Sequence, residues 1–197
     1  VAKYITVYKN EKDIAERVES YLPYPVFVKP SRSGSSVGVS KARNRTELLS
    51  ALGTAFCADK KVIIEETLSG KECEVALFCD RNGKVTVSMP GEIDSGAVFY
   101  DFDAKYKNHT STVFIPARIS EKEAQITVSL AKKLFNILEC ESLARADFFV
   151  SDGRVVFNEI NTLPGFTSIS MYPRLMETTG FPISDLLDML IASARIK

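Results

Sequence analysis

The sequence predicts an α+β protein rather than one built on a purely parallel sheet. Segments with the two-residue period of strands alternate with segments that carry the apolar stripe of an amphipathic helix. Several strands nevertheless follow one another across short turns such as Asn82-Gly83 and Asp152-Gly153. Hairpins join antiparallel neighbours, and together with the helices they indicate α+β lobes.

Residues 1–66 are expected to form a first, small lobe. Asn10 is the predicted N-cap of its first helix, with Asp13 at the position of the acidic partner in a capping box. A polar loop, Ser31–Ser36, separates two of its strands. The expected strands are Tyr4–Tyr8, Val26–Lys29 and Val37–Ser40, and the expected helices run from Asn10 to about Leu22 and from about Thr46 to Ala58.

Val62–Glu66 is expected to begin a second sheet, and residues 67–197 to form the larger lobe. The clearest helix starts at the capping box of Ser120 and Glu123 and keeps an apolar stripe through Ile137. The other expected elements are the strands Glu72–Cys79, Lys84–Ser88 and Val113–Ile115, a strand pair joined at Asp152-Gly153, and a final helix from Ser184 through Ile191.

A long connection, about 94–112, shows no clear periodicity. Such connections are uncommon inside compact domains unless they have a function, so a lid is expected here. The segment contains Lys105, Tyr106 and the only histidine, His109, for which a solvated loop position is the preferred interpretation.

The composition disfavours several classes of partner. Twenty-five acidic and 25 basic residues cancel without any block of like charge, so neither nucleic acid nor a membrane is expected to bind. No apolar run reaches the roughly 20 residues that cross a bilayer, and the first residues lack a signal-peptide pattern, which predicts a cytoplasmic location. The four cysteines form no Cys-x-x-Cys pair and are interpreted as core residues in a reducing compartment.

Two apolar strands each carry two polar residues in alternate positions. Arg145 and Asp147 belong to one strand, and Glu159 and Asn161 to the next. Residues i and i+2 of a strand share a face. Oxygen ligands without histidine or cysteine suit a hard cation, so the sequence predicts a Mg²⁺ site. A surface hairpin with solvated charges is the alternative, which the apolar flanking residues disfavour.

The turn between these strands decides whether the two pairs meet on one face. A two-residue turn would pair Asp147 with Asn158 and direct Glu159 to the opposite face. A three-residue loop at 151–153 would pair Arg145 with Glu159 and align all four polar side chains. We expect the three-residue loop.

Lys29 ends an apolar strand and precedes a loop of small residues, Ser31–Gly38. Small residues let backbone N–H groups approach phosphate oxygens, and an ammonium group neutralises their charge. The loop is not a Walker A motif, because no Gly-Lys-Ser/Thr follows its glycines. A plain turn is the alternative, but together with the Asp147 cluster the loop is interpreted as a nucleotide phosphate site.

Three glutamates, Glu65, Glu66 and Glu72, follow the apolar residues Val62–Ile64. The backbone of a segment that leaves a strand can bond to an adenine edge, and a carboxylate can accept hydrogen bonds from ribose hydroxyls. Exposed charges at strand ends are the alternative, and spacing alone does not separate the two interpretations.

A family resemblance is carried by Val28–Val39, Ile64–Glu66, Ala104–Tyr106, Ala144–Asp147 and Asn158–Thr167. Together these segments closely resemble the D-alanine–D-alanine ligases over almost the whole chain. The resemblance implies the ATP-grasp fold, in which two α+β lobes clamp ATP with its magnesium. In that family ATP phosphorylates the carboxylate of one D-alanine, and the amine of a second D-alanine attacks the acyl phosphate to give the dipeptide for peptidoglycan.

The resemblance also implies nucleotide contacts, with ATP as co-substrate. These fall on Lys29, Ser35 and Ser36 at the phosphates, Glu65, Glu66 and Leu68 at the adenine, Glu72 at the ribose, and Lys105 with Tyr106 in the lid over the γ-phosphate.

Metal and substrate contacts are implied in the same way. Two Mg²⁺ ions, or Mn²⁺ in their place, are expected at Asp147, Glu159 and Asn161. Arg145 and the N–H of Gly165 are expected to donate to the tetrahedral oxyanion, which preorganised positive potential stabilises. Ser170 and Met171 are expected to hold the carboxylate of the second amino acid.

One part of the family pattern has no counterpart before Val1. The family has an N-terminal domain that carries an acid and a histidine near the first D-alanine, together with a second phosphate lysine. The chain is therefore expected to be a central and C-terminal fragment that binds ATP and is a poor ligase alone. The intact enzyme is expected to be a homodimer.

Two alternative functions remain open. The same chemistry could take D-serine or D-lactate as second substrate, although Ala104–Tyr106 and Met171 resemble the dipeptide enzyme more closely. A non-catalytic nucleotide-binding module is the other alternative, which the retention of all metal-type residues disfavours.

Overall fold

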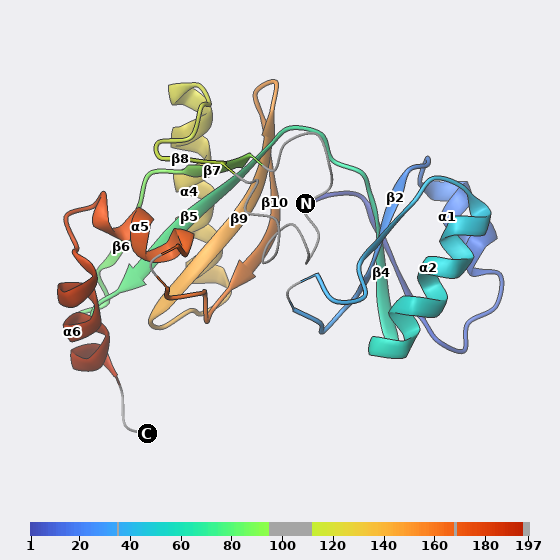
Figure 1. Ribbon diagram of the computed structural model, residues 1–197, viewed down its shortest axis with the longest axis horizontal. Coiled ribbons are helices and arrows are strands. Elements are labelled where there is room, and N and C mark those ends of the chain that lie inside the picture. Colours follow the sequence, from blue (N-terminus) through green and yellow to red (C-terminus); the bar gives the residue numbers. More distant parts are fainter. Residues whose placement is uncertain (35, 95–111, 168, 195–197) are drawn as a thin grey trace. The chain divides into compact units, whose positions relative to one another are not determined.

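The predicted α+β class is confirmed, and the chain divides into two units (Figure 1). The described strand pairs are antiparallel in both units. Within the described residues, the first unit ends at Leu68, two residues after Glu66, the lobe boundary expected from the sequence. The computed structural model describes residues 1–34, 36–94, 112–167 and 169–194; of these, 1–68 belong to the first unit and 69–94 and 112–194 to the second.

The sheet of the first unit has the strand order β1-β4-β2-β3. Helices α1 and α2 cover one face of this sheet (Figure 1), and side chains such as Val28, Leu48 and Ile64 form the core between them. Alternate strand residues point to the other face. The elements are β1 (Tyr4–Tyr8), α1 (Ile14–Tyr21), β2 (Val26–Pro30), β3 (Ser40–Ala42), α2 (Arg45–Ala58) and β4 (Lys61–Glu66).

Three expectations for the first unit are wrong in detail. β4 pairs with both β1 and β2, so Val62–Glu66 belongs to the first sheet and does not begin the second. The first helix begins at Ile14, because Asp13 has a left-handed conformation (φ 55°) and its side chain makes no cap hydrogen bond. The strand expected at Val37–Ser40 begins only at Ser40.

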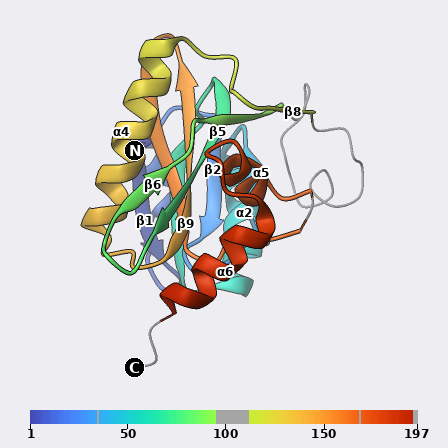
Figure 2. The ribbon, with the colours of Figure 1, turned by 90° about the vertical axis from the view of Figure 1, so that its left-hand side faces the viewer.

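The sheet of the second unit has the strand order β10-β9-β5-β7-β8, and β6 pairs with β5. Figure 2 shows α4 on one side of these strands and α5 and α6 on the other. Phe135 of α4 packs against Ala146 and Phe148, whereas Tyr172 and Leu186 pack on the opposite face. The elements are β5 (Lys71–Cys79), β6 (Val85–Val87), β7 (Gly91–Asp94), β8 (Thr112–Phe114), α4 (Glu121–Ile137), β9 (Leu143–Ser151), β10 (Arg154–Asn161), α5 (Met171–Glu177) and α6 (Ile183–Ser193).

The capping box predicted for α4 is present. Ser120 Oγ accepts the N–H of Glu123, and the Glu123 carboxylate accepts the N–H of Ser120. Two elements of this unit were not predicted, β7 and the short α5, because neither is long enough to show a period in the sequence.

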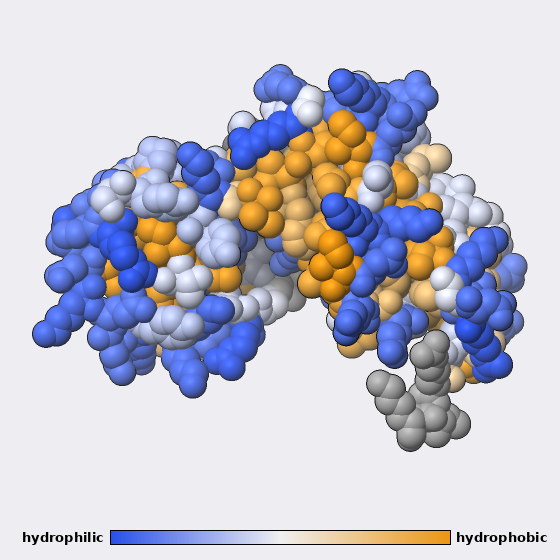
Figure 3. All heavy atoms as spheres, turned by 180° about the vertical axis from the view of Figure 1, so that it is seen from behind, coloured by the Kyte–Doolittle hydropathy of each residue, from blue (hydrophilic) through white to orange (hydrophobic). Residues whose placement is uncertain are grey.

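Figure 3 shows hydrophobic residues on one face of each unit, set among hydrophilic ones. Apolar residues at the surface are ordinary for folded domains. In the part of the chain that the structure describes, no helix is both long and apolar enough to cross a bilayer.

Candidate functional site

The turn between β9 and β10 differs from the expected three-residue loop. Ser151 pairs with Arg154, which leaves Asp152 and Gly153 as a two-residue turn. Both turn residues have positive φ, 50° and 78°. Positive φ at both positions is typical of a type I′ turn, whose twist matches that of the flanking strands. The expected loop is therefore wrong, and so is the register derived from it.

A β-bulge nevertheless aligns the four polar side chains. The register of β10 against β9 shifts by one residue between Phe157 and Glu159. Glu159 therefore lies opposite Asp147, and Asn161 lies opposite Arg145. A bulge re-aims the side chains that follow it. All four side chains thus share the face of the sheet opposite to α4, which a regular two-residue hairpin would not allow.

Arg145 lies between two buried carboxylates on this face. Its Nε and Nη2 donate to the two carboxylate oxygens of Asp147 at 2.8 and 2.7 Å, and Nε lies 3.2 Å from Oε2 of Glu74. Asp147 is 2% exposed and Glu74 is 3% exposed. Burial alone would lower the pKa of Arg145, but the neighbouring carboxylates, Glu159 among them, outweigh burial and raise that pKa. The guanidinium therefore stays charged.

Glu74 is a site residue that was not predicted from the sequence. It lies opposite Asp147 of β9 on one side and opposite Gly91 of β7 on the other. Glu72 and Glu74 alternate along β5 in the same way as the polar pairs of β9 and β10, and this alternation was the available signal. The sequence does not show that β5 and β9 are neighbours, so it could not bring Glu74 to Asp147.

The segment after β10 is held by side-chain hydrogen bonds to its backbone. Oδ1 of Asn161 accepts the N–H of Leu163 at 3.0 Å, and Oγ of Ser170 accepts the N–H of Thr167 at 3.0 Å. A Cβ atom at Gly165 would lie 2.9 Å from Oγ of Ser170. Only glycine fits there without a shift, so Gly165 and Ser170 are close neighbours.

Met171 is a core residue. It is 5% exposed and belongs to the cluster of Phe78, Tyr172 and Leu175. A Cβ atom at Gly91 would lie 3.1 Å from its sulfur, so β7 passes directly over the side chain. The backbone of Met171 is the part of the residue that remains for the expected substrate contact.

In the first unit, Lys29 and Glu65 form an ion pair on the sheet face opposite to α1 and α2. Their Nζ and Oε2 atoms are 2.5 Å apart, and they come from the adjacent strands β2 and β4. Glu66 points to the other face and accepts the N–H of Lys3 at 2.9 Å. Leu68 is half-buried at the end of the unit.

The loop after β2 includes two positive-φ residues, Ser36 at 58° and Gly38 at 77°. A Cβ atom at Gly38 would lie 2.9 Å from Cγ of Pro30, so the loop returns closely over the strand end next to Lys29. Most of the expected lid, residues 95–111, lies outside the described residues, and so do five residues named above: Ser35, Ala104, Lys105, Tyr106 and His109.

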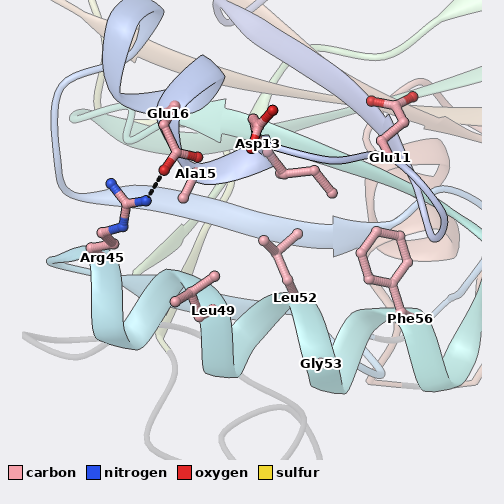
Figure 4. A pocket seen from close by; sticks show the side chains of 10 residues that line it. Glu11, Asp13, Ala15, Glu16, Arg45, Leu49, Leu52, Gly53 and Phe56 are labelled. Atoms are coloured by element: carbon pink, nitrogen blue, oxygen red, sulfur yellow. Dashed lines mark hydrogen bonds and ion pairs between the residues drawn. The ribbon is translucent and has the colours of Figure 1, made fainter.

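A groove of about 390 Å³ lies between α1 and α2 (Figure 4). Ala15 and Leu52 are among its apolar lining residues, and an ion pair between Glu16 and Arg45 crosses one end. The groove is on the helical side of the first sheet, whereas Lys29 lies on the other face. It is therefore separate from the candidate site.

Among the described residues, no three carboxylate, imidazole or thiol groups stand in the arrangement of a metal centre. Both carboxylate oxygens of Asp147 face Arg145 in this structure. A cation bound at Asp147 would have to draw those oxygens away from the guanidinium.

The chain matches the family model described as D-ala D-ala ligase C-terminus over residues 1–192. The D-alanine–D-alanine ligase of Caldicellulosiruptor bescii is 48% identical over 198 residues, covering 97% of this chain and 54% of that protein. The D-alanine–D-alanine ligase of Enterococcus faecalis is 45% identical, covering 94% of this chain and 53% of that protein. The chain thus spans about half the length of the curated relatives it matches.

Solved structures are also similar to almost the whole of this chain. The VanG D-Ala:D-Ser ligase from Enterococcus faecalis has a TM-score of 0.87 and 36% identity, covering 98% of this chain and 57% of that chain. The D-alanine–D-alanine ligase from Bacillus anthracis complexed with ATP has a TM-score of 0.80 and 28% identity, covering 98% of this chain and 60% of that chain.

Proposed function

Because the chain belongs to the D-alanine–D-alanine ligase family, of which it matches the C-terminal part, we propose that it is the ATP-binding part of a ligase that joins two D-alanines. Its α+β architecture is the ATP-grasp fold of that family. The observation that carries the proposal is the alignment of Arg145, Asp147, Glu159 and Asn161 on one face of the second sheet. Residues 1–66 and 67–197 are proposed as the small and large lobes of the fold.

The donor set of the second unit fits divalent cations. Glu74, Asp147 and Glu159 supply three carboxylates around the single guanidinium of Arg145, which leaves an excess of negative charge. Hard cations take oxygen ligands, and Asn161 adds a neutral one. We therefore assign Asp147, Glu159 and Asn161 as ligands of two Mg²⁺ ions, for which Mn²⁺ can substitute. When bound, these ions would neutralise the charge on the transferring phosphate.

The nucleotide contacts of the first unit are proposed from its charges and backbone. Lys29 would exchange its ion pair with Glu65 for a contact with phosphate, because phosphate carries the larger negative charge. The positive-φ loop at Ser36 would present backbone N–H groups to the same phosphates. The remaining assigned contacts are Ser35, Lys105 and Tyr106 at the phosphates, Glu65, Glu66 and Leu68 at the adenine, and Glu72 at the ribose.

The proposed reaction has two steps. The carboxylate of one D-alanine attacks the γ-phosphorus of ATP, which gives an acyl phosphate and ADP. The amine of the second D-alanine then attacks the acyl carbon, loses a proton and expels phosphate. Arg145 and the N–H of Gly165 would donate to the oxyanion that forms in this second step. Ser170 and the backbone of Met171 would hold the carboxylate of the second amino acid.

D-Serine is the alternative second substrate, since the VanG relative is a D-Ala:D-Ser ligase. The relatives of higher identity are D-alanine–D-alanine ligases, which favours D-alanine. Product analysis of the full-length enzyme with equal D-alanine and D-serine at neutral pH separates the two. A dominant mixed dipeptide would contradict our assignment. A cytoplasmic location and a homodimeric full-length enzyme remain predictions.

Calorimetric titration of the 197-residue chain with ATP, with and without Mg²⁺, tests the core of the proposal. We expect binding that Mg²⁺ strengthens, and no D-alanine-dependent phosphate release by this chain alone. Lys29→Gln should weaken ATP binding, whereas the matched variant of an exposed lysine, Lys60→Gln, should not. The proposal fails if ATP does not bind or if both variants bind it equally well.

A further inference from the structure

Glu74 is a buried carboxylate beside the proposed cation ligands that has no role assigned so far. It lies in the middle of β5, directly opposite Asp147. Its carboxylate is enclosed by protein and is 3.2 Å from Nε of Arg145. A carboxylate is expensive to bury and is retained only where it is paired. The Arg145 guanidinium compensates the charge of Glu74 at this position.

Arg145 is shared by two carboxylates, that of Asp147 on its own strand β9 and that of Glu74 on the neighbouring strand β5. The same Nε atom is 2.8 Å from Oδ1 of Asp147 and 3.2 Å from Oε2 of Glu74. Nη2 of Arg145 donates to Oδ2 of Asp147 at 2.7 Å. The contact of Arg145 with Asp147 is therefore the shorter one, and it is bidentate. The Glu74 carboxylate lies close enough to Nε to keep its contact with Arg145 when Asp147 turns away.

We propose that Glu74 is a positioning residue, whose carboxylate holds Arg145 in place when Asp147 turns its oxygens toward a divalent cation. The inference deepens the proposed function and rests on it, because it takes Asp147 as a cation ligand. Without the charge of Glu74, the guanidinium would hold Asp147 more strongly, and the negative charge of the face would be smaller. Both effects weaken cation binding. Groups that orient a metal ligand in this way commonly contribute about 10-fold to 100-fold in metal affinity.

Glu92 provides a matched control in the same sheet. It lies on β7, is 2% exposed and is also bound to an arginine. Its Oε2 accepts hydrogen bonds from the backbone N–H of Arg118 at 2.9 Å and from Nε of Arg118 at 3.1 Å. It lies opposite Cys73, whose side chain belongs to the core on the α4 face. The substitution Glu92→Gln therefore removes a buried, arginine-bound carboxylate and leaves the sheet face that carries Asp147 unchanged.

The test is the binding of Mn²⁺ alone to the 197-residue chain, measured by the electron paramagnetic resonance signal of free Mn²⁺. We expect Glu74→Gln to bind Mn²⁺ at least about 10-fold more weakly than the unmodified chain. Glu92→Gln should bind it as the unmodified chain does, and Asp147→Asn should lose most of the binding. Thermal unfolding of each variant shows whether it is folded at the temperature of the titration.

The outcomes separate the inference from the proposed function. Weak binding by Asp147→Asn together with unchanged binding by Glu74→Gln overturns the role of Glu74 and leaves the cation site standing. Equal weakening by Glu74→Gln and Glu92→Gln also overturns it, because the effect is then that of any buried charge. Unchanged binding by Asp147→Asn overturns both proposals. If Glu74→Gln does not fold, Glu74→Asp takes its place, because the shorter side chain keeps the charge but moves it away from Arg145. If Glu74→Asp binds Mn²⁺ as tightly as the unmodified chain does, the inference is overturned.

Discussion

Glu159 lies opposite Asp147 because a tight turn and a bulge act together in one hairpin. The turn sets a register in which Asn158 would face Asp147, and the one-residue shift after Phe157 moves Glu159 into that place. Either device alone would leave the Glu159 carboxylate on the α4 face of the sheet, away from Asp147. The proposed cation site therefore depends on the backbone of β10 as much as on the identity of its side chains.

Gly153→Ala should destabilise the protein by about 1–2 kcal/mol, because a side chain in the left-handed region is strained. The added Cβ would meet no atom within 4 Å, so the backbone conformation (φ 78°) is the only cost. Gly53→Ala is the matched control in the interior of α2, where it also meets nothing within 4 Å and should stabilise by about 0.5–1 kcal/mol. Urea unfolding measures both, and changes of the same sign would contradict the assigned turn.

Glu159→Gln should remove most of the Mg²⁺-dependent part of nucleotide binding. The substitution keeps the size of the side chain and removes one negative charge from the face that carries Asp147 and Arg145. Glu141→Gln, at an exposed position before β9, is the control and should bind as the unmodified chain does. Calorimetry with ADP, with and without Mg²⁺, makes the comparison. An undiminished Mg²⁺ effect in Glu159→Gln would show that this carboxylate is not a ligand.

Asp59→Asn should make the free energy of unfolding less dependent on pH in the acidic range. The Arg32 guanidinium, 2.7 and 3.2 Å from the carboxylate oxygens, holds the pKa of Asp59 well below its usual range, although burial opposes this. A lowered folded-state pKa stabilises the protein above the unfolded value of about 3.9, and this stabilisation is lost as the pH falls toward the folded value. The variant should therefore be less stable at pH 7, with a gap that narrows between about pH 5 and pH 2.

Thermal unfolding at a series of pH values measures this gap. Asp188→Asn, at an exposed position of α6, is the control and should be as stable as the unmodified chain at pH 7. A difference for Asp59→Asn that does not change with pH would contradict the role assigned to its pair with Arg32.

Cys73 should resist alkylation in the folded protein, and Cys57 should not. Burial, followed by the charge of Glu92, raises the pKa of the Cys73 thiol to about 12, so almost no reactive thiolate forms at pH 8. Cys57 is exposed on α2. Brief treatment with iodoacetamide at pH 8, followed by peptide mass mapping, should modify Cys57 first and Cys73 only after unfolding. Equal modification of both would mean that the Cys73 side chain does not lie in the core on the α4 face.

Local signals in the sequence predicted most of the elements of the fold. The capping box of Ser120 and Glu123 predicted the start of α4 because it needs only residues within one helical turn. The alternation of Arg145 with Asp147 predicted a shared face for the same reason. The start of α1 was missed because Asp13 has a conformation that its residue type permits but does not require.

The sequence by itself determined which side chains could bind a cation or a phosphate, since the polar pairs of β9 and β10 and the lysine before the small-residue loop are local patterns. Only the tertiary structure decided which of them meet. The pairing of β5 with β9 brought Glu74 to Arg145, the bulge turned Glu159 to the same face, and the packing of α5 on β5 and β7 buried Met171. Strand pairing and helix packing join residues far apart in the chain, so no local pattern can specify them.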